Sequence, residues 1–80
     1  MFHVYILKSV ENNRYYVGQT GSLEKRLADH NLGLCRSTKK WLPWRLIYKE
    51  VFLSRADAMK RERQIKNYKG GIAFKKIVSN

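Results

Sequence analysis

The chain has 80 residues, of which 44% are hydrophobic, and this length has room for one domain with a modest core. Seventeen Lys and Arg against six Asp and Glu give a formal net charge of +11, which favours a polyanionic partner. No run approaches the roughly 20 apolar residues that a membrane span needs, and one Cys with two His excludes a disulfide or a Cys/His zinc cluster. We therefore expect a single domain over residues 1–80, located in the cytoplasm.

The first third of the chain predicts a β-hairpin followed by a helix. Residues 2–9 and 14–20 are rich in Val, Ile, Tyr and Phe, which favour strands, and Glu11-Asn12-Asn13 between them forms a turn. Ser22 is a candidate N-cap for a helix that runs to about residues 31–34 and closes near Gly33. One stripe of this helix is expected to face the sheet, with Arg26 at its edge: Leu23, Leu27, His30 and Leu34.

The rest of the chain predicts a polar loop over residues 35–43, then a third strand and two helices. Ser54 with Asp57 resembles a capping box, and Gly70-Gly71 ends the helix that it opens. The expected elements are a strand over 45–52, a helix from 54 to about 68 and a short helix over 72–78. The fold class is therefore α/β (α+β), a small three-stranded antiparallel sheet flanked by helices in the order β-β-α-β-α-α.

Glu62 is one of six acidic residues and lies on a mostly basic helix. On a helical wheel it projects within roughly 60° of three apolar residues, Ala58, Met59 and Ile65. The ordinary interpretation is an ion pair with a neighbouring Lys or Arg. The functional interpretation is a divalent-cation ligand, because Mg²⁺ is held in proteins by one or two carboxylates with water and phosphate. The residue alone leaves both open.

Two tyrosines and one helix face supply the other candidate site residues. Tyr5 and Tyr16 lie in the middle of the two hairpin strands, so the phenols are expected to be near each other, and Gly18 permits close backbone approach. Arg26 and His30 are four residues apart, on one helix face, and suit a shared phosphate contact. Packing is the ordinary role of such tyrosines.

Taken in order, these residues closely resemble the GIY-YIG nuclease family, in particular its stand-alone, single-domain bacterial members. The resemblance rests on Val4-Tyr5, Tyr16-Val17-Gly18, Arg26, His30-Asn31, Pro43-Trp44 and Ala58 to Glu62. Three departures are that His3 replaces the first family Gly, that Val4 and Val17 replace Ile, and that no late Asn follows Glu62 at the usual place. The resemblance covers nearly the whole chain.

The resemblance implies a metal-dependent endonuclease that hydrolyses DNA phosphodiester bonds, with one Mg²⁺, or another divalent cation such as Mn²⁺, held by Glu62. Tyr5 is the preferred general base and Tyr16 a hydrogen-bonding partner of substrate or water, although the two roles are interchangeable. Arg26 would hold the phosphate, and His30 would orient Arg26, water or substrate. Lys8 matches a basic position of some relatives and is an auxiliary candidate for activating the Tyr5 phenol.

Backbone contacts with nucleic acid are expected from four basic residues: Lys39, Lys40, Arg63 and Lys66. Little base specificity is expected, so a structure-selective role in DNA repair or recombination would take its selectivity from substrate shape or a protein partner. Trp44 is expected in the core, and Trp41 is left open between packing and base stacking. The alternative is a non-catalytic module that binds DNA or RNA on the same scaffold, and RNA remains an alternative substrate.

Overall fold

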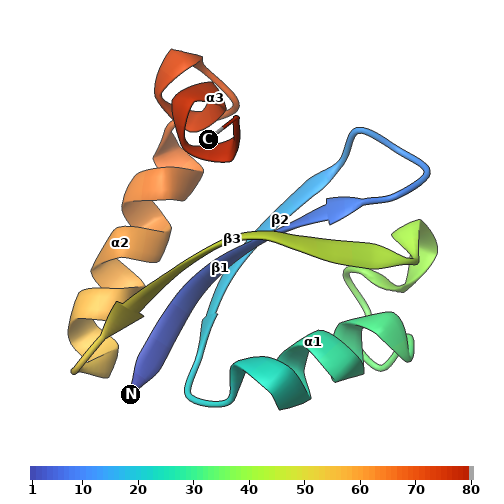
Figure 1. The fold of residues 1–80 in the computed structure, drawn as a ribbon, viewed down its shortest axis with the longest axis horizontal. Helices are drawn as coiled ribbons and strands as arrows, with labels where there is room; N and C mark the ends of the chain where they lie inside the picture. Colours follow the sequence, from blue (N-terminus) through green and yellow to red (C-terminus); the bar gives the residue numbers. More distant parts are fainter. Residues whose placement is uncertain (80) are drawn as a thin grey trace.

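The computed structural model describes residues 1–79, which form a three-stranded antiparallel sheet with three α-helices. The strands are β1 (Phe2–Ser9), β2 (Tyr15–Thr20) and β3 (Trp44–Phe52), in the order β2-β1-β3. The helices are α1 (Leu23–Asn31), α2 (Arg55–Asn67) and α3 (Ile72–Val78), with a 3-10 turn, η1, over Lys39–Trp41. The predicted fold class and element order are confirmed (Figure 1).

The central strand β1 is buried on both of its faces. Residues 4–7 are at most 1% exposed, because α1 covers one face of the sheet and α2 with α3 the other (Figure 1). Side chains alternate along a strand, so Tyr5 and Leu7 pack on the α1 side and Val4 and Ile6 on the α2 side. This one strand therefore contributes to two separate cores. None of the described helices is long and apolar enough to cross a membrane.

A β-bulge at Ile47 changes which residues of β3 face each core. Ile6 pairs with Tyr48 while the next β1 residue, Leu7, pairs with Leu46, so Ile47 is the extra residue. An extra residue inverts the alternation of the side chains that follow it. Leu46 consequently packs on the α1 side, and Tyr48 packs on the α2 side.

The core on the α2 side is aliphatic and aromatic. Its buried members are Val4, Ile6, Val17, Ala58, Ile65 and Phe74. Ser54 caps α2 as predicted, because its Oγ accepts a hydrogen bond of 3.2 Å from the Asp57 amide. Gly70 has a φ of 74°, a left-handed conformation that favours glycine, and it directs the chain from α2 into α3.

The end of α1 agrees with the prediction, but the position of Leu34 does not. The helix stops at Asn31, and the chain turns at Gly33, whose φ is 77°. Leu34 is therefore 69% exposed, and its predicted place in the sheet-facing stripe was wrong. Ser22 occupies the N-cap position, but its side chain makes no capping hydrogen bond.

The last residue of α1 attaches the helix to β3. The Asn31 amide oxygen accepts a hydrogen bond of 2.6 Å from the Trp44 backbone N–H, and its Nδ2 donates one of 3.1 Å to the Trp44 carbonyl. Two hydrogen bonds from one side chain to one residue fix both position and orientation. Trp44 itself is 5% exposed, which confirms that it packs in the core.

Candidate active site

A chain of buried hydrogen bonds crosses the α1 side of the sheet. The Tyr5 hydroxyl lies 3.0 Å from His30 Nε2, and His30 Nδ1 lies 2.8 Å from Thr38 Oγ1. Thr38 Oγ1 is 3.4 Å from the Cys35 carbonyl oxygen. Tyr5, His30 and Thr38 are each at most 1% exposed, so the chain connects β1, α1 and the loop before β3 in the interior.

These bonds have one consistent direction. The Cys35 carbonyl only accepts, so the Thr38 hydroxyl donates to it and accepts from a protonated His30 Nδ1. Nε2 is then free to accept the Tyr5 proton. Burial, followed by the nearby Arg26 charge, lowers the pKa of His30. The imidazole is therefore neutral near pH 7, as this arrangement requires.

Tyr5 is enclosed and poorly suited to act as a base. Burial and then Tyr16 raise the pKa of its hydroxyl well above the usual value, and Arg26 lowers it by less. Arg26 is half-buried on α1, and its interaction with the Tyr5 hydroxyl raises the pKa of the guanidinium. A general base works best with a pKa near the working pH. The preference for Tyr5 as general base is therefore not supported by its surroundings.

Tyr16 is the more accessible of the two phenols. It is half-buried, with its ring centroid 6.2 Å from that of Tyr5 and 4.8 Å from that of His30. Gly18 makes this packing possible, since a Cβ there would lie 2.7 Å from the Tyr5 hydroxyl oxygen and 3.0 Å from Tyr16 Cε2. The predicted close approach at Gly18 is confirmed.

Glu62 lies on α2, apart from this chain. Its side chain is 20% exposed, and Oε2 accepts a hydrogen bond of 2.5 Å from Lys66 Nζ one turn later. Ala58 and Ile65 are buried as predicted, but Met59 is 42% exposed. No hydrogen bond or ion pair joins Glu62 to Tyr5, Tyr16 or His30 within residues 1–79. The ordinary interpretation, an ion pair, is thus present in the free protein.

Lys8 lies on the other face of β1 from Tyr5. The two residues are three apart, and alternation along a strand places them on opposite faces. The Lys8 ammonium is 5.8 Å from the centroid of the Tyr15 ring. The suggestion that Lys8 activates the Tyr5 phenol is therefore corrected, because the sheet separates the two groups.

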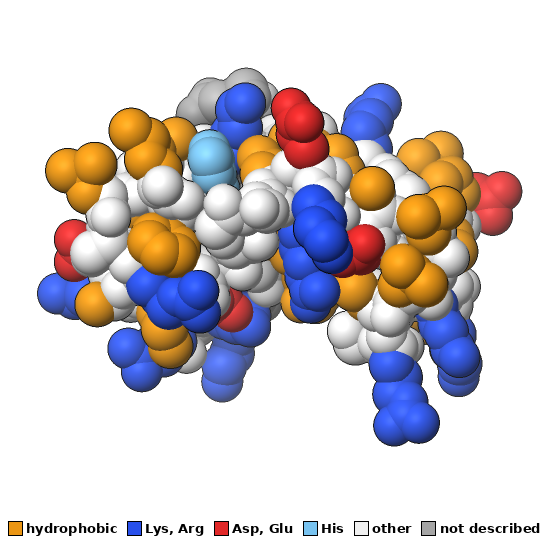
Figure 2. Space-filling model, turned by 90° about the horizontal axis from the view of Figure 1, so that it is seen from below, with side chains coloured by type: hydrophobic (Ala, Val, Ile, Leu, Met, Phe, Trp, Pro, Cys, Tyr) orange, Lys and Arg blue, Asp and Glu red, His pale blue; other side chains and the backbone are white. Residues whose placement is uncertain are grey.

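The remaining predicted contacts lie on the surface. Lys39, Lys40, Arg63 and Lys66 are all exposed, and their contacts with nucleic acid stay predictions. Figure 2 shows Lys and Arg side chains that project from across one face of the molecule, with acidic side chains among them. Trp41 is half-buried, and the Arg14 guanidinium covers its ring at 3.9 Å from the centroid.

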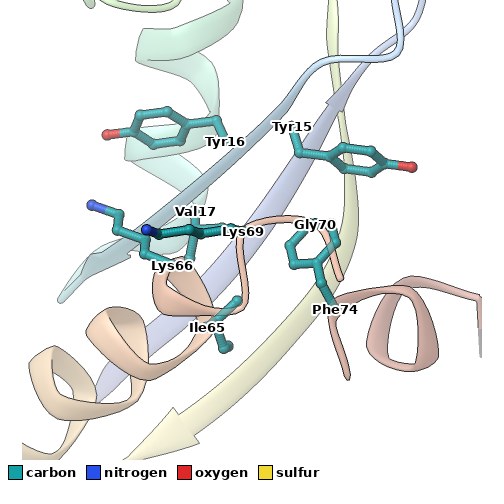
Figure 3. Close-up of a pocket in the computed structure, with 8 residues that line it drawn as sticks. All are labelled: Tyr15, Tyr16, Val17, Ile65, Lys66, Lys69, Gly70 and Phe74. Atoms are coloured by element: carbon teal, nitrogen blue, oxygen red, sulfur yellow. The ribbon is translucent and has the colours of Figure 1, made fainter. Parts of the chain in front are cut away.

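A pocket is lined by Tyr16, which packs against His30, and by Lys66, the ion-pair partner of Glu62. It has a volume of about 370 Å³ and lies between β2, the end of α2 and the start of α3. Tyr16 lines it from β2 and Lys66 from α2 (Figure 3). A molecule in this pocket would therefore contact direct neighbours of His30 and Glu62.

Sequence reasoning missed Thr38 as a partner of His30. Thr38 holds two side chains in place. Its hydroxyl bonds to His30, and its carbonyl accepts a 2.8 Å hydrogen bond from the Trp44 indole N–H. Thr38 appears in the sequence as one polar residue of a loop, and neither spacing nor periodicity relates it to His30. Asn31 was included in the family resemblance because it follows His30. Its two hydrogen bonds to Trp44 were not predicted.

The fold and the placement of Tyr5, Tyr16 and His30 are those of a known protein family. Residues 1–75 match the model of the GIY-YIG catalytic domain, and the chain belongs to the GIY-YIG family. The match includes the two strands that carry the tyrosines and the helix that carries Glu62. Family membership implies a nuclease domain and a nucleic acid substrate.

Within this family the chain is similar to proteins named UPF0213. It is 42% identical over 67 residues to one from Staphylococcus haemolyticus, covering 82% of this chain and 80% of that protein. Another, from Halobacterium salinarum, is 37% identical over 67 residues, covering 82% and 86%. The NMR structure of a UPF0213 protein from Bacillus halodurans is 30% identical, has a TM-score of 0.51 and covers 84% of this chain and 72% of that one.

Proposed function

We propose that this protein is a metal-dependent endonuclease that hydrolyses phosphodiester bonds of DNA. The observation that carries the proposal is the buried chain from Tyr5 through His30 to Thr38, beside Arg26. A core that served stability alone would favour apolar side chains here, because each buried polar group needs a partner. Membership of the GIY-YIG family supports a role of these groups in nucleic acid hydrolysis.

Glu62 is the proposed ligand of one Mg²⁺ or Mn²⁺ ion per active site. Its half-buried carboxylate already holds a cation, the Lys66 ammonium, and one carboxylate with water and phosphate oxygens suits Mg²⁺. Within residues 1–79, Glu62 is the one carboxylate of the proposed site, which favours a single ion over a two-metal arrangement. Such an ion, when bound, supplies Lewis-acid stabilisation of charge on the phosphate and the leaving oxygen.

The side chains on the α1 side have separate proposed roles. Arg26 binds the scissile phosphate, because its guanidinium fork matches phosphate oxygens and stabilises their growing negative charge. Tyr16 contacts the attacking water, since its phenol is more accessible than that of Tyr5. In its ionised form, the phenolate, Tyr16 would take the proton of that water and return to the neutral phenol. Tyr5 and neutral His30 are positioning residues that hold each other and orient Arg26. This exchanges the two tyrosine roles that the resemblance favoured.

The cellular role remains part of the proposal. We propose that the domain over residues 1–80 acts in the cytoplasm, in DNA repair or recombination. The charge of +11 supports binding to phosphates without base readout. Selection of a cleavage site then depends on the shape of the DNA or on a protein partner.

Cleavage of a set of substrates tests this function. Branched, nicked, flapped and plain DNA, with RNA of the same sequences, are incubated with the protein in Mg²⁺, in Mn²⁺ and in EDTA. We expect metal-dependent cutting of DNA, strongest on the branched forms, and affinity that falls steeply with salt. Binding without cutting in either metal would instead identify a non-catalytic module. Cutting of RNA alone would identify an RNA-directed nuclease.

A further inference from the structure

The pocket between β2 and the end of α2 has walls that suit a flat aromatic ring. Three apolar side chains form its interior: Val17, Ile65 and Phe74. Tyr15 lies on its rim, 41% exposed, with its ring centroid 5.1 Å from that of Phe74 in an edge-on arrangement. The volume of about 370 Å³ is within the range of pockets that hold small organic ligands.

The charge around the pocket indicates which class of ligand carries the aromatic ring. Lys66 and Lys69 line it, and both are exposed. They project on the same side of β2 as the Tyr16 phenol (Figure 3). Lys69 makes no ion pair within residues 1–79, and no carboxylate lines the pocket. An aromatic recess beside ammonium groups complements a base attached to a phosphate.

The pocket lies beside residues that are proposed to take part in cleavage of the phosphodiester bond. Tyr16 belongs both to the pocket and to the cluster around His30. Lys66 belongs to the pocket and binds the carboxylate of Glu62. A nucleotide whose base lies in the pocket would therefore place its phosphate between the two groups proposed to act on it.

We propose that this pocket binds one unpaired nucleobase of the strand that is cut, next to the scissile phosphate. The inference rests on the proposed nuclease function and deepens it by naming the substrate class, a nucleic acid with an unstacked nucleotide at the cleavage site. Tyr15 supplies a stacking surface and Lys69 contacts the adjoining phosphate. A base inside a regular duplex is already paired and stacked, and it reaches the pocket only after leaving the helix.

Binding in EDTA tests this inference separately from cleavage. The probes are two fluorescent DNA duplexes of one sequence, one with a single bulged adenine and one with an abasic bulge at the same place. Fluorescence anisotropy gives the affinity of the wild-type protein for each. Base stacking on aromatic side chains predicts about tenfold tighter binding of the bulged adenine. Equal affinities for the two duplexes would overturn the inference.

Two variants of one residue assign the preference to the pocket. Tyr15→Ala is expected to lose the tenfold preference while it keeps the wild-type affinity for the abasic duplex, which also shows that it is folded. Tyr15→Phe retains the ring and should retain the preference. A preference that persists in Tyr15→Ala overturns the assignment. Cleavage without a base preference would support the proposed nuclease function and show that the pocket inference is wrong. A base preference without cleavage would support the pocket and show that the proposed nuclease function is wrong.

Discussion

The two faces of the sheet bury very different chemistry. Towards α2 and α3 the buried residues are aliphatic or aromatic, with Ile6 and Ile65 among the least exposed. Towards α1 the interior holds a phenol, an imidazole and a hydroxyl in one hydrogen-bonded chain. Apolar contacts have no preferred direction. In a hydrogen-bonded chain, by contrast, a small displacement of one group breaks a hydrogen bond and leaves a buried polar group unsatisfied. The comparison indicates that the buried core on the α2 side mainly stabilises the fold, whereas the α1 side buries groups held in position for chemistry. The α2 side contributes to the proposed site from its surface, through Glu62 and the pocket.

Among substitutions in the strands, the largest expected effect on turnover comes from replacing one of the two tyrosines by phenylalanine. Tyr16→Phe removes the phenol proposed to contact water and should lower turnover by about a hundredfold or more, with almost no loss of stability. Tyr5→Phe leaves His30 Nε2 without its donor and should destabilise the fold by about 1–3 kcal/mol, with a smaller effect on turnover. Single-turnover cleavage and urea unfolding measure the two quantities. A larger loss of turnover in Tyr5→Phe than in Tyr16→Phe would restore Tyr5 as the base.

Two neighbouring β1 residues compare the faces directly. Ile6 and Leu7 are both fully buried but point to opposite sides of the sheet, so Ile6→Ala and Leu7→Ala should each cost about 2–5 kcal/mol in unfolding free energy. Leu7 packs in the cluster that contains Tyr5. Turnover per folded molecule should therefore fall in Leu7→Ala and stay near wild type in Ile6→Ala. Equal turnover in the two variants would mean that the faces are not divided in this way.

The buried imidazole predicts a smaller, pH-dependent effect. The pKa of His30 is lower in the folded protein than in the unfolded chain, where it is about 6.5. The unfolded state therefore binds more protons below that pH, and stability should be complete above it and fall as the pH decreases towards the folded pKa. Urea unfolding from pH 7.5 to 5.5 should show this decrease, and His30→Gln should reduce it. An unchanged pH dependence in the variant would assign the effect to other groups.

Much of the fold could be predicted because it depends on local patterns. Strand-forming residues on either side of a turn identified β1 and β2, and the turn chemistry of Gly70 and the Ser54 cap delimited α2. Leu34 was misplaced because helical periodicity continues past the point where Gly33 turns the chain. The bulge at Ile47 has no local signature in the sequence, since it exists only relative to the register of β1.

The candidate site could be predicted less completely than the fold. The resemblance identified Tyr5, Tyr16 and His30, and the structure brings them together. It could not order the two tyrosines, because their difference in burial arises from tertiary packing around Gly18. The bond to Thr38 closes a loop of eight residues, and no periodicity describes such a loop.

Two glutamates on the α2 side distinguish a metal ligand from an ordinary ion-pair partner. Glu50 and Glu62 are similarly exposed, at 26% and 20% of the side chain, and each is paired with a cation of α2, Arg61 or Lys66. Cleavage of branched DNA in Mg²⁺ is measured for Glu62→Gln and for the matched control Glu50→Gln at a temperature where both are folded. If Glu62 is the metal ligand, turnover should fall by about a thousandfold or more in Glu62→Gln and stay at the wild-type level in Glu50→Gln. Wild-type cutting by Glu62→Gln, or an equal loss in Glu50→Gln, would contradict the role of Glu62 as metal ligand.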